Sequence, residues 1–225
     1  ACYRARRMTT PRTPPPAAGA PQPIPTHVIT GTLGVGKTTA IARLFAAKPA
    51  AERWVVILNQ FPDTRIDVLT VAGAARGEFD VRLVPGGCLC CASELDFTRT
   101  LRELVRGVRP ARLFVEPRGI GHPAAIIEEL LAHASRGAIA LESIVCLVDP
   151  ARVPEIGPDA GVARDQAEVA DVLVLSKADL ATDAQRAAFR EWAQAFYPPK
   201  RWVGECAAGE LPREALAPPL ARAPF

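Results

Sequence analysis

The apolar positions of this chain form short continuous runs, separated by stretches in which apolar residues recur every three or four positions. Short apolar runs bounded by polar residues are typical of strands covered on both faces of a parallel sheet. They occur at 27–29, 54–59, 81–84, 112–116, 144–150 and 172–176. Helical spacing follows at 40–45, 95–105, 123–133 and 183–196. This alternation predicts a three-layer α/β domain with a mainly parallel sheet.

A glycine-rich segment follows the first apolar run and matches G-x-x-x-x-G-K-[ST] from Gly31 to Thr38. Glycines let backbone N–H groups approach phosphate oxygens, and the following helix directs its positive end toward them. We therefore predict a P-loop NTPase fold. The phosphate-binding residues are expected to be Gly31, Gly34, Val35, Gly36, Lys37, Thr38 and Thr39. Lys37 is expected to reach the β- and γ-phosphates as a catalytic cation, and the Thr38 hydroxyl to bind Mg²⁺.

An acidic residue ends the fourth apolar run, and a glycine follows three positions later. Glu116 occupies the place where P-loop NTPases keep the carboxylate that holds Mg²⁺ through water. Gly119 would bring a backbone N–H to the γ-phosphate, so both are predicted to serve catalysis. A glutamate at the end of a strand is more often only solvated, and its place after the P-loop favours the functional interpretation.

The segment Ser176-Lys177-Ala178-Asp179 follows the last apolar run and resembles the Asn-Lys-x-Asp sequence that selects guanine. A carboxylate at Asp179 can accept from two donors of guanine, a pair that adenine does not offer. Lys177 is expected to lie along the base. Ser176 stands where the longer Asn amide is usual, and a strand followed by a capped helix is the structural alternative.

Three cysteines, Cys88, Cys90 and Cys91, stand close together after Gly86-Gly87. Three thiolates that converge at a turn suit Zn²⁺ or Cu(I), with a fourth ligand from elsewhere. An incomplete shell of this kind favours transfer of the metal over permanent storage. A redox pair and inert buried cysteines are the alternatives. Cys146 and Cys206 are assigned to packing.

The charge balance argues against a nucleic-acid partner once the N-terminus is set apart. The chain has 27 basic and 24 acidic residues, and residues 1–25 hold four arginines, no acid and seven of the 22 prolines. The remainder is nearly neutral, with 23 bases against 24 acids. We expect a disordered tail at 1–25, one domain at 26–215 and a loose end at 216–225. No apolar run is long enough to span a bilayer, so we expect a soluble protein with reduced thiols in the cytoplasm.

Taken together, these motifs make the chain similar to the CobW family of P-loop GTPases. The resemblance rests on the loop from Gly31 to Thr39, the C-x-C-C motif at Cys88, the E-x-x-G pattern at Glu116 and the base motif at Lys177 and Asp179. It covers residues 26 to about 215. The chain departs from the family switch, because Gln60 and Pro62 replace Glu and Gly between Asn59 and Asp67. It also ends where family members generally continue into a smaller C-terminal domain.

What the resemblance implies is hydrolysis of GTP with Mg²⁺, coupled to delivery of a metal to a client metalloprotein. Zinc is favoured and cobalt is open, as is a homodimer. An ATP-using transferase on the same loop is one alternative, and it predicts equal affinity for ATP and GTP. A nucleotide-gated interaction protein is another, and it predicts that serine at Cys88, Cys90 and Cys91 leaves metal content unchanged.

Overall fold

A computed structural model describes residues 22–60, 73, 79–85, 92–119, 122–155 and 161–217 of the chain. The strands are β1 Ile24–Gly31, β2 Trp54–Gln60, β3 Phe79–Pro85, β4 Arg112–Glu116, β5 Ile139–Val148, β6 Val172–Leu175 and β7 Trp202–Glu205. The α-helices are α1 Lys37–Ala47, α3 Ala92–Glu103, α4 Ala124–Ser135, α5 Val162–Glu168 and α6 Asp183–Gln194. Among these residues no helix is both long and apolar enough to cross a membrane.

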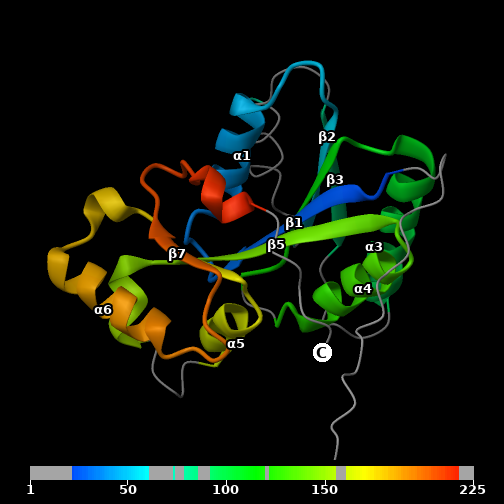
Figure 1. Cartoon of the computed structure of the whole chain (residues 1–225). Helices are drawn as coiled ribbons and strands as arrows, with labels where there is room; N and C mark the ends of the chain where they lie inside the picture. The colour runs from blue at the N-terminus through cyan, green and yellow to red at the C-terminus, as the bar shows by residue number, and fades with distance from the viewer. Residues whose placement is uncertain are drawn as a thin grey trace, which may run out of the picture.

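The strands form one parallel sheet in the order β3-β2-β4-β1-β5-β6-β7. Helix α1 lies on one face, and α3, α4, α5 and α6 cover the other (Figure 1). The three-layer α/β prediction is confirmed, and every pairing in the described sheet is parallel. Because the order reverses on either side of β1, the carboxyl end of β1 lies at a switch point, where ligands bind in open α/β sheets.

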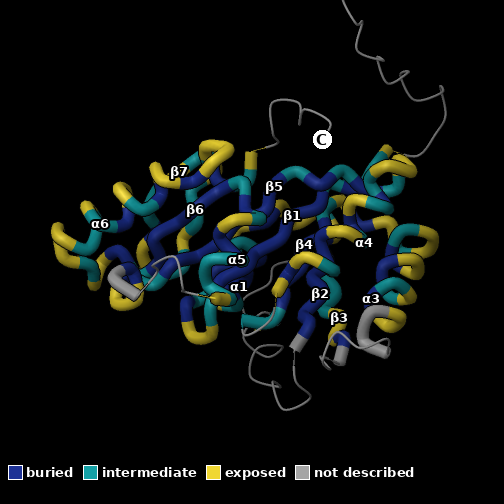
Figure 2. Tube along the Cα trace, turned by 90° about the horizontal axis from the view of Figure 1, so that it is seen from below, coloured by how far each residue is buried: buried dark blue, intermediate teal, exposed yellow. Residues whose placement is uncertain are grey.

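The central strands are buried on both faces, as their continuous apolar runs predict (Figure 2). One core packs the sheet against α3 to α6, and a second, smaller core packs it against α1. Phe114 belongs to the smaller core, where its ring makes edge contacts with Phe45 and lies tilted against Trp54. Leu216 also packs there, in the short helical turn Arg213–Leu216.

A polar cluster interrupts the smaller core at β1. The His27 ring is fully buried, with Nδ1 2.9 Å from Ser143 Oγ and Nε2 2.6 Å from an Arg112 guanidinium nitrogen. Since arginine can only donate, Nε2 accepts and Nδ1–H donates to Ser143. Burial, followed by the nearby charges of Arg112 and Arg201, lowers the pKa of His27 to about 3. Glu142 Oε2 lies 3.3 Å from Nε2 of this neutral ring, so the contact is not an ion pair. The ion pair of Glu142 is formed with the Arg112 guanidinium, 3.5 Å away.

Helix α3 differs from its prediction at both ends. Leu95 is 69% exposed and does not belong to the buried face, which consists of Phe97, Leu101 and Leu104. The last turn, Leu104–Val108, widens into a π-helix and ends at Arg109 in a left-handed conformation. The apolar spacing predicted the helix but carries no signal for this wider turn.

Candidate functional site

The glycine-rich segment connects β1 to α1, as the sequence predicts. Gly31 has φ of 137°, and a β-carbon there would lie 2.5 Å from the Leu147 carbonyl oxygen of β5. Only glycine fits this approach, because a side chain would collide with backbone that cannot move aside. Gly36, with φ of 100°, precedes the first residue of α1 without a side-chain cap. The N–H groups at the start of α1 are therefore not covered by a capping side chain.

Lys37 lies folded over this loop instead of extending into solvent. Its side chain is buried, and Nζ donates to the carbonyl oxygens of Gly31 at 3.0 Å and Thr32 at 3.1 Å. The two bonds hold the ammonium group at the centre of the loop, where the motif requires a cation beside the phosphates.

The side chains of Thr38 and Glu116 meet although they are 78 positions apart in the chain. Thr38 Oγ1 donates to both carboxylate oxygens, at 3.0 and 3.1 Å. Glu116 is the last residue of β4 and only 1% exposed, so its charge sits in a poorly hydrated place beside the first turn of α1. The structure thus brings together the two residues that the sequence assigned separately to Mg²⁺.

Gly119 lies directly against the P-loop. A β-carbon at this position would come 2.7 Å from the Leu33 backbone nitrogen and 2.8 Å from Lys37 Nζ. Any larger residue would displace the loop after β4 from the P-loop. The contact places Gly119 beside the predicted position of the terminal phosphate.

Asn59 adds a polar group at the same edge of the sheet. Its side chain is 7% exposed, and Oδ1 is buried without a hydrogen-bond partner in the described part of the chain. In the sheet Leu58 pairs with Glu116, so Asn59 stands one residue beyond that carboxylate. A hydroxyl, a carboxylate and an amide oxygen that lacks a partner are the hard oxygen donors that suit hydrated Mg²⁺.

The base motif forms the turn after β6, and Lys177 is its strained residue. Lys177 has φ of 50°, and its Nζ lies 2.7 Å from Asp149 Oδ2 at the end of β5. Burial acts to raise the pKa of Asp149, but hydrogen bonds from Lys177 and the Ala151 N–H, with the charges of Lys177 and Arg152, lower it below its usual value. Asp149, which sequence reasoning did not single out, thus orients the predicted base-stacking lysine.

The other two residues of the base motif differ in exposure. The Ser176 hydroxyl is buried and donates to the Val148 carbonyl oxygen at 3.0 Å, which ties β6 to β5. Asp179 is exposed, as a residue that must meet a base from solvent should be. A contact of Ser176 with the base stays a prediction.

Two further parts of the base site were missed by sequence reasoning. The segment after β7 crosses to α1, where a β-carbon on Gly209 would lie 3.0 Å from Thr39 Cγ2, and Ala178 N donates to Cys206 O at 3.0 Å. Arg186 of α6 donates to the Ala178 carbonyl oxygen and pairs with Glu205 of β7. These contacts hold the motif from both sides, and no short sequence pattern announces them.

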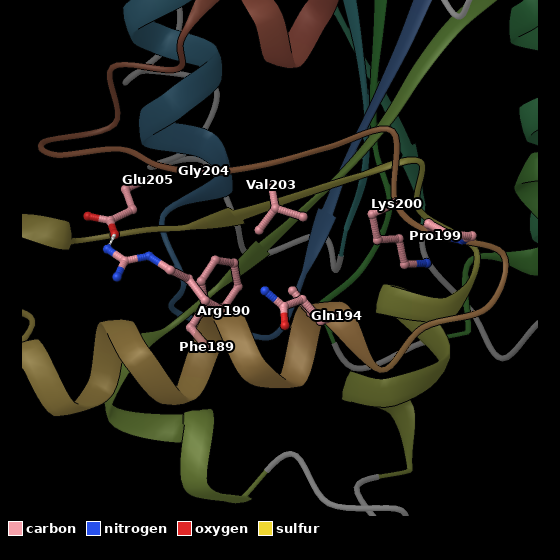
Figure 3. Close-up of a pocket in the computed structure, with 9 residues that line it drawn as sticks. Phe189, Arg190, Gln194, Pro199, Lys200, Val203, Gly204 and Glu205 are labelled. Carbon is pink, nitrogen blue, oxygen red and sulfur yellow. Dashed lines mark hydrogen bonds and ion pairs between the residues drawn. The ribbon is translucent and has the colours of Figure 1, made fainter.

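A hollow of about 340 Å³ lies between α6 and β7 (Figure 3). Phe189 and Val203 line it, and the ion pair of Arg190 with Glu205, 3.0 Å long, spans one end. None of the predicted phosphate- or base-contacting residues lines this hollow. It is therefore separate from the candidate nucleotide site.

Cys88, Cys90 and Cys91 lie outside the described residues, as do Pro62 and Asp67 of the expected switch. Strand β3, which precedes these cysteines in the chain, is described. β3 ends at Pro85, which pairs in register with Gln60, so the end of β3 lies at the same sheet edge as Glu116. Of the described thiols, burial raises the pKa of Cys146 to about 12 and, with the charge of Asp179, that of Cys206 to about 11, so both are un-ionised packing residues.

The comparisons with known proteins identify the family of this chain. A family model described as CobW/HypB/UreG, nucleotide-binding domain, matches residues 25–203. Zinc chaperone YeiR of Escherichia coli (strain K12) is 38% identical over 172 residues, which are 75% of this chain and 51% of that protein. Zinc chaperone CobW of a Sinorhizobium species is 30% identical over 214 residues, covering 84% and 60%. The chain thus spans little more than half the length of these relatives.

A solved structure gives the same result for the fold. The crystal structure of Zn(II)-bound YjiA GTPase from E. coli matches with a TM-score of 0.56 at 22% identity, over 86% of this chain and 62% of that one. At this identity the likeness concerns the fold alone.

Proposed function

This chain belongs to the CobW/HypB/UreG nucleotide-binding family, and we propose that it binds GTP, hydrolyses it with Mg²⁺ and couples the cycle to zinc delivery to a client protein. The observation that carries the proposal is the contact of Thr38 with Glu116, with Gly119 against Lys37. These four residues come from two separate motifs and meet at the carboxyl edge of the sheet. A structural glycine turn would not need a buried carboxylate beside it.

The donor set supports Mg²⁺ as the cofactor. Thr38 and Glu116, with Asn59 near them, would hold the ion and its waters, and the bound ion would neutralise charge on the phosphates. The protein residues supply the remaining parts. Lys37 holds a positive charge at the loop centre, the N–H groups of the loop and of α1 surround the anion, and Gly119 presents its backbone to the terminal phosphate.

The turn after β6 supports guanine as the base. Asp179 can accept from the ring N–H and the exocyclic amine of guanine, while Lys177, held by Asp149, lies beside it. The crossing segment at Cys206 and Gly209 closes the site toward Thr39. An adenine base would leave the carboxylate of Asp179 without its donor pair.

Zinc as the cargo is supported by the thiol segment and by the relatives. Three cysteines within four residues favour Zn²⁺ among common metals, and YeiR and CobW are both named zinc chaperones. Strand β3, which precedes the segment in the chain, ends at the sheet edge that carries Glu116, and on this basis we propose that nucleotide and metal lie on one rim. We infer that hydrolysis changes this rim and alters the hold on the metal. The client is expected to be a metalloprotein.

The proposal is tested by measuring bound zinc and nucleotide preference on one preparation. Elemental analysis should find about one zinc per chain, and the protein carrying C88S, C90S and C91S together should lose it. Competition binding should favour GTP over ATP by about tenfold or more, because ATP leaves a charge-assisted pair unmade. Equal zinc content in both proteins, or equal affinity for the two nucleotides, would overturn the corresponding part.

A further inference from the structure

Helix α5 contacts the loop after β4 through two neighbouring residues. Gln166 Nε2 donates to the Gly119 carbonyl oxygen at 3.3 Å, and the Gln166 side chain is fully buried. One position earlier, Asp165 Oδ2 lies 2.6 Å from His122 Nδ1, and both of these side chains are about half exposed. The loop is therefore held at Gly119 and again at His122 by one turn of one helix.

The bond at Gly119 acts on the residue that meets the P-loop. Gly119 has no side chain with which to anchor itself, and its backbone packs against Leu33 and Lys37. A hydrogen bond to its carbonyl oxygen restrains the orientation of a backbone that would otherwise rotate freely. Gln166 therefore restrains the backbone of Gly119, which also packs against the P-loop.

Helix α5 is itself fixed relative to the sheet. Lys200 Nζ, from the loop before β7, donates to the carbonyl oxygens of Ala167, Glu168 and Ala170 at 2.6, 3.0 and 2.9 Å. These bonds join Lys200 to carbonyl groups in the last turn of the helix and just beyond it. The support for Gly119 is thus a helix that is itself bonded to the segment before β7.

We propose that Gln166 and Asp165 are positioning residues that set how strongly the protein prefers GTP to GDP. The inference rests on the proposed role of Gly119 at the terminal phosphate, since that phosphate is present in GTP and absent from GDP. Gln166 and Asp165 do not touch the nucleotide in this account. They hold Gly119 where its N–H meets the extra phosphate, and they add nothing to the binding of GDP.

The test compares affinities for GDP and for a GTP analogue with an imido bridge between the β- and γ-phosphates, both with Mg²⁺. Gln166→Met keeps the length of the side chain and removes the donor, so analogue affinity should fall about 3- to 10-fold while GDP affinity stays within about twofold. Asp165→Ala, at an exposed position that tolerates change, should reduce analogue affinity about twofold or more. Glu168→Ala is the matched control on the same helix, because its side chain pairs with Arg164 at 2.7 Å and makes no described contact with the loop after β4, so the ratio should stay unchanged.

If Gln166→Met and Asp165→Ala leave the ratio of the GDP and analogue affinities unchanged, whether or not both affinities fall, the inference is overturned. Gly119→Ala separates this failure from failure of the proposed function. If Gly119→Ala lowers analogue affinity and the α5 variants do not, the positioning role is wrong and the phosphate role stands. If Gly119→Ala also leaves the ratio unchanged, both are wrong.

Discussion

Thr38 Oγ1 lies 3.0 and 3.1 Å from the two carboxylate oxygens of Glu116, so one hydroxyl bridges the first helix of the domain and the end of its fourth strand. The parallel sheet makes this contact possible, because β1 and β4 are neighbours and both end at the same edge. The glycine-rich loop and the E-x-x-G pattern, which are far apart in the sequence, are thus in direct contact in the fold.

Glu116→Gln should lower GTP hydrolysis by about 10- to 100-fold, with the largest loss at limiting Mg²⁺. The amide oxygen still accepts from Thr38, so the fold is kept. The substitution removes the carboxylate charge of Glu116, which would orient the ion and its waters. Phosphate release measured against Mg²⁺ concentration checks this. Glu103→Gln, at an exposed position on α3, is the control. A variant that matches the unmodified protein at every Mg²⁺ concentration would exclude Glu116 from the metal site.

Asp179→Asn should exchange guanine for xanthine as the preferred base. Xanthine carries an oxygen where guanine carries its amine, and an amide can donate to that oxygen while accepting from the ring N–H. GTP affinity should fall about 10- to 100-fold and XTP affinity should rise. Competition against a fluorescent nucleotide measures both values, with the exposed Asp183→Asn as the control. Loss of both nucleotides together would indicate a collapsed turn instead of base recognition.

The buried His27 should make stability depend on pH. Its pKa is about 3 in the folded protein and about 6.5 when unfolded, so only the unfolded chain takes up a proton between these values. The contribution is fully present above pH 6.5 and decreases as pH falls. Lowering the pH from 6.5 to 4.5 should therefore reduce the free energy of unfolding by about 2 kcal/mol.

His27→Gln keeps a donor and an acceptor but does not titrate, so it should remove that slope. Denaturant unfolding of both proteins at each pH measures the difference, in which the shared carboxylates cancel. Parallel pH profiles for the two proteins would contradict the assignment of His27 as a buried neutral ring.

The elements with strong local patterns were predictable, and the contacts between distant residues were not. The continuous run at Trp54–Asn59 predicted β2, and the helical spacing at 183–196 predicted α6. By contrast, a break in register between β1 and β5 accompanies the His27 cluster, and nothing in the sequence indicates it. Pro123 precedes α4 as its cap instead of opening it.

The same division applies to the candidate site. Lys37, Thr38, Glu116 and Gly119 were assigned from motif spacing in the segments that follow the first and fourth apolar runs. Asp149, Arg186 and Gln166 act through other residues, and their partners lie 28, 8 and 47 positions away. Such supporting contacts depend on the order of strands in the sheet, which a single sequence does not reveal.

The coupling of nucleotide and metal is tested most directly by measuring Zn²⁺ affinity in two nucleotide states of one protein. Competition with a chromophoric chelator, in the presence of the imido GTP analogue and then of GDP, should give affinities that differ by about fivefold or more. The difference should vanish when Cys88, Cys90 and Cys91 are serine. Equal affinities in both states of the unmodified protein would contradict the account.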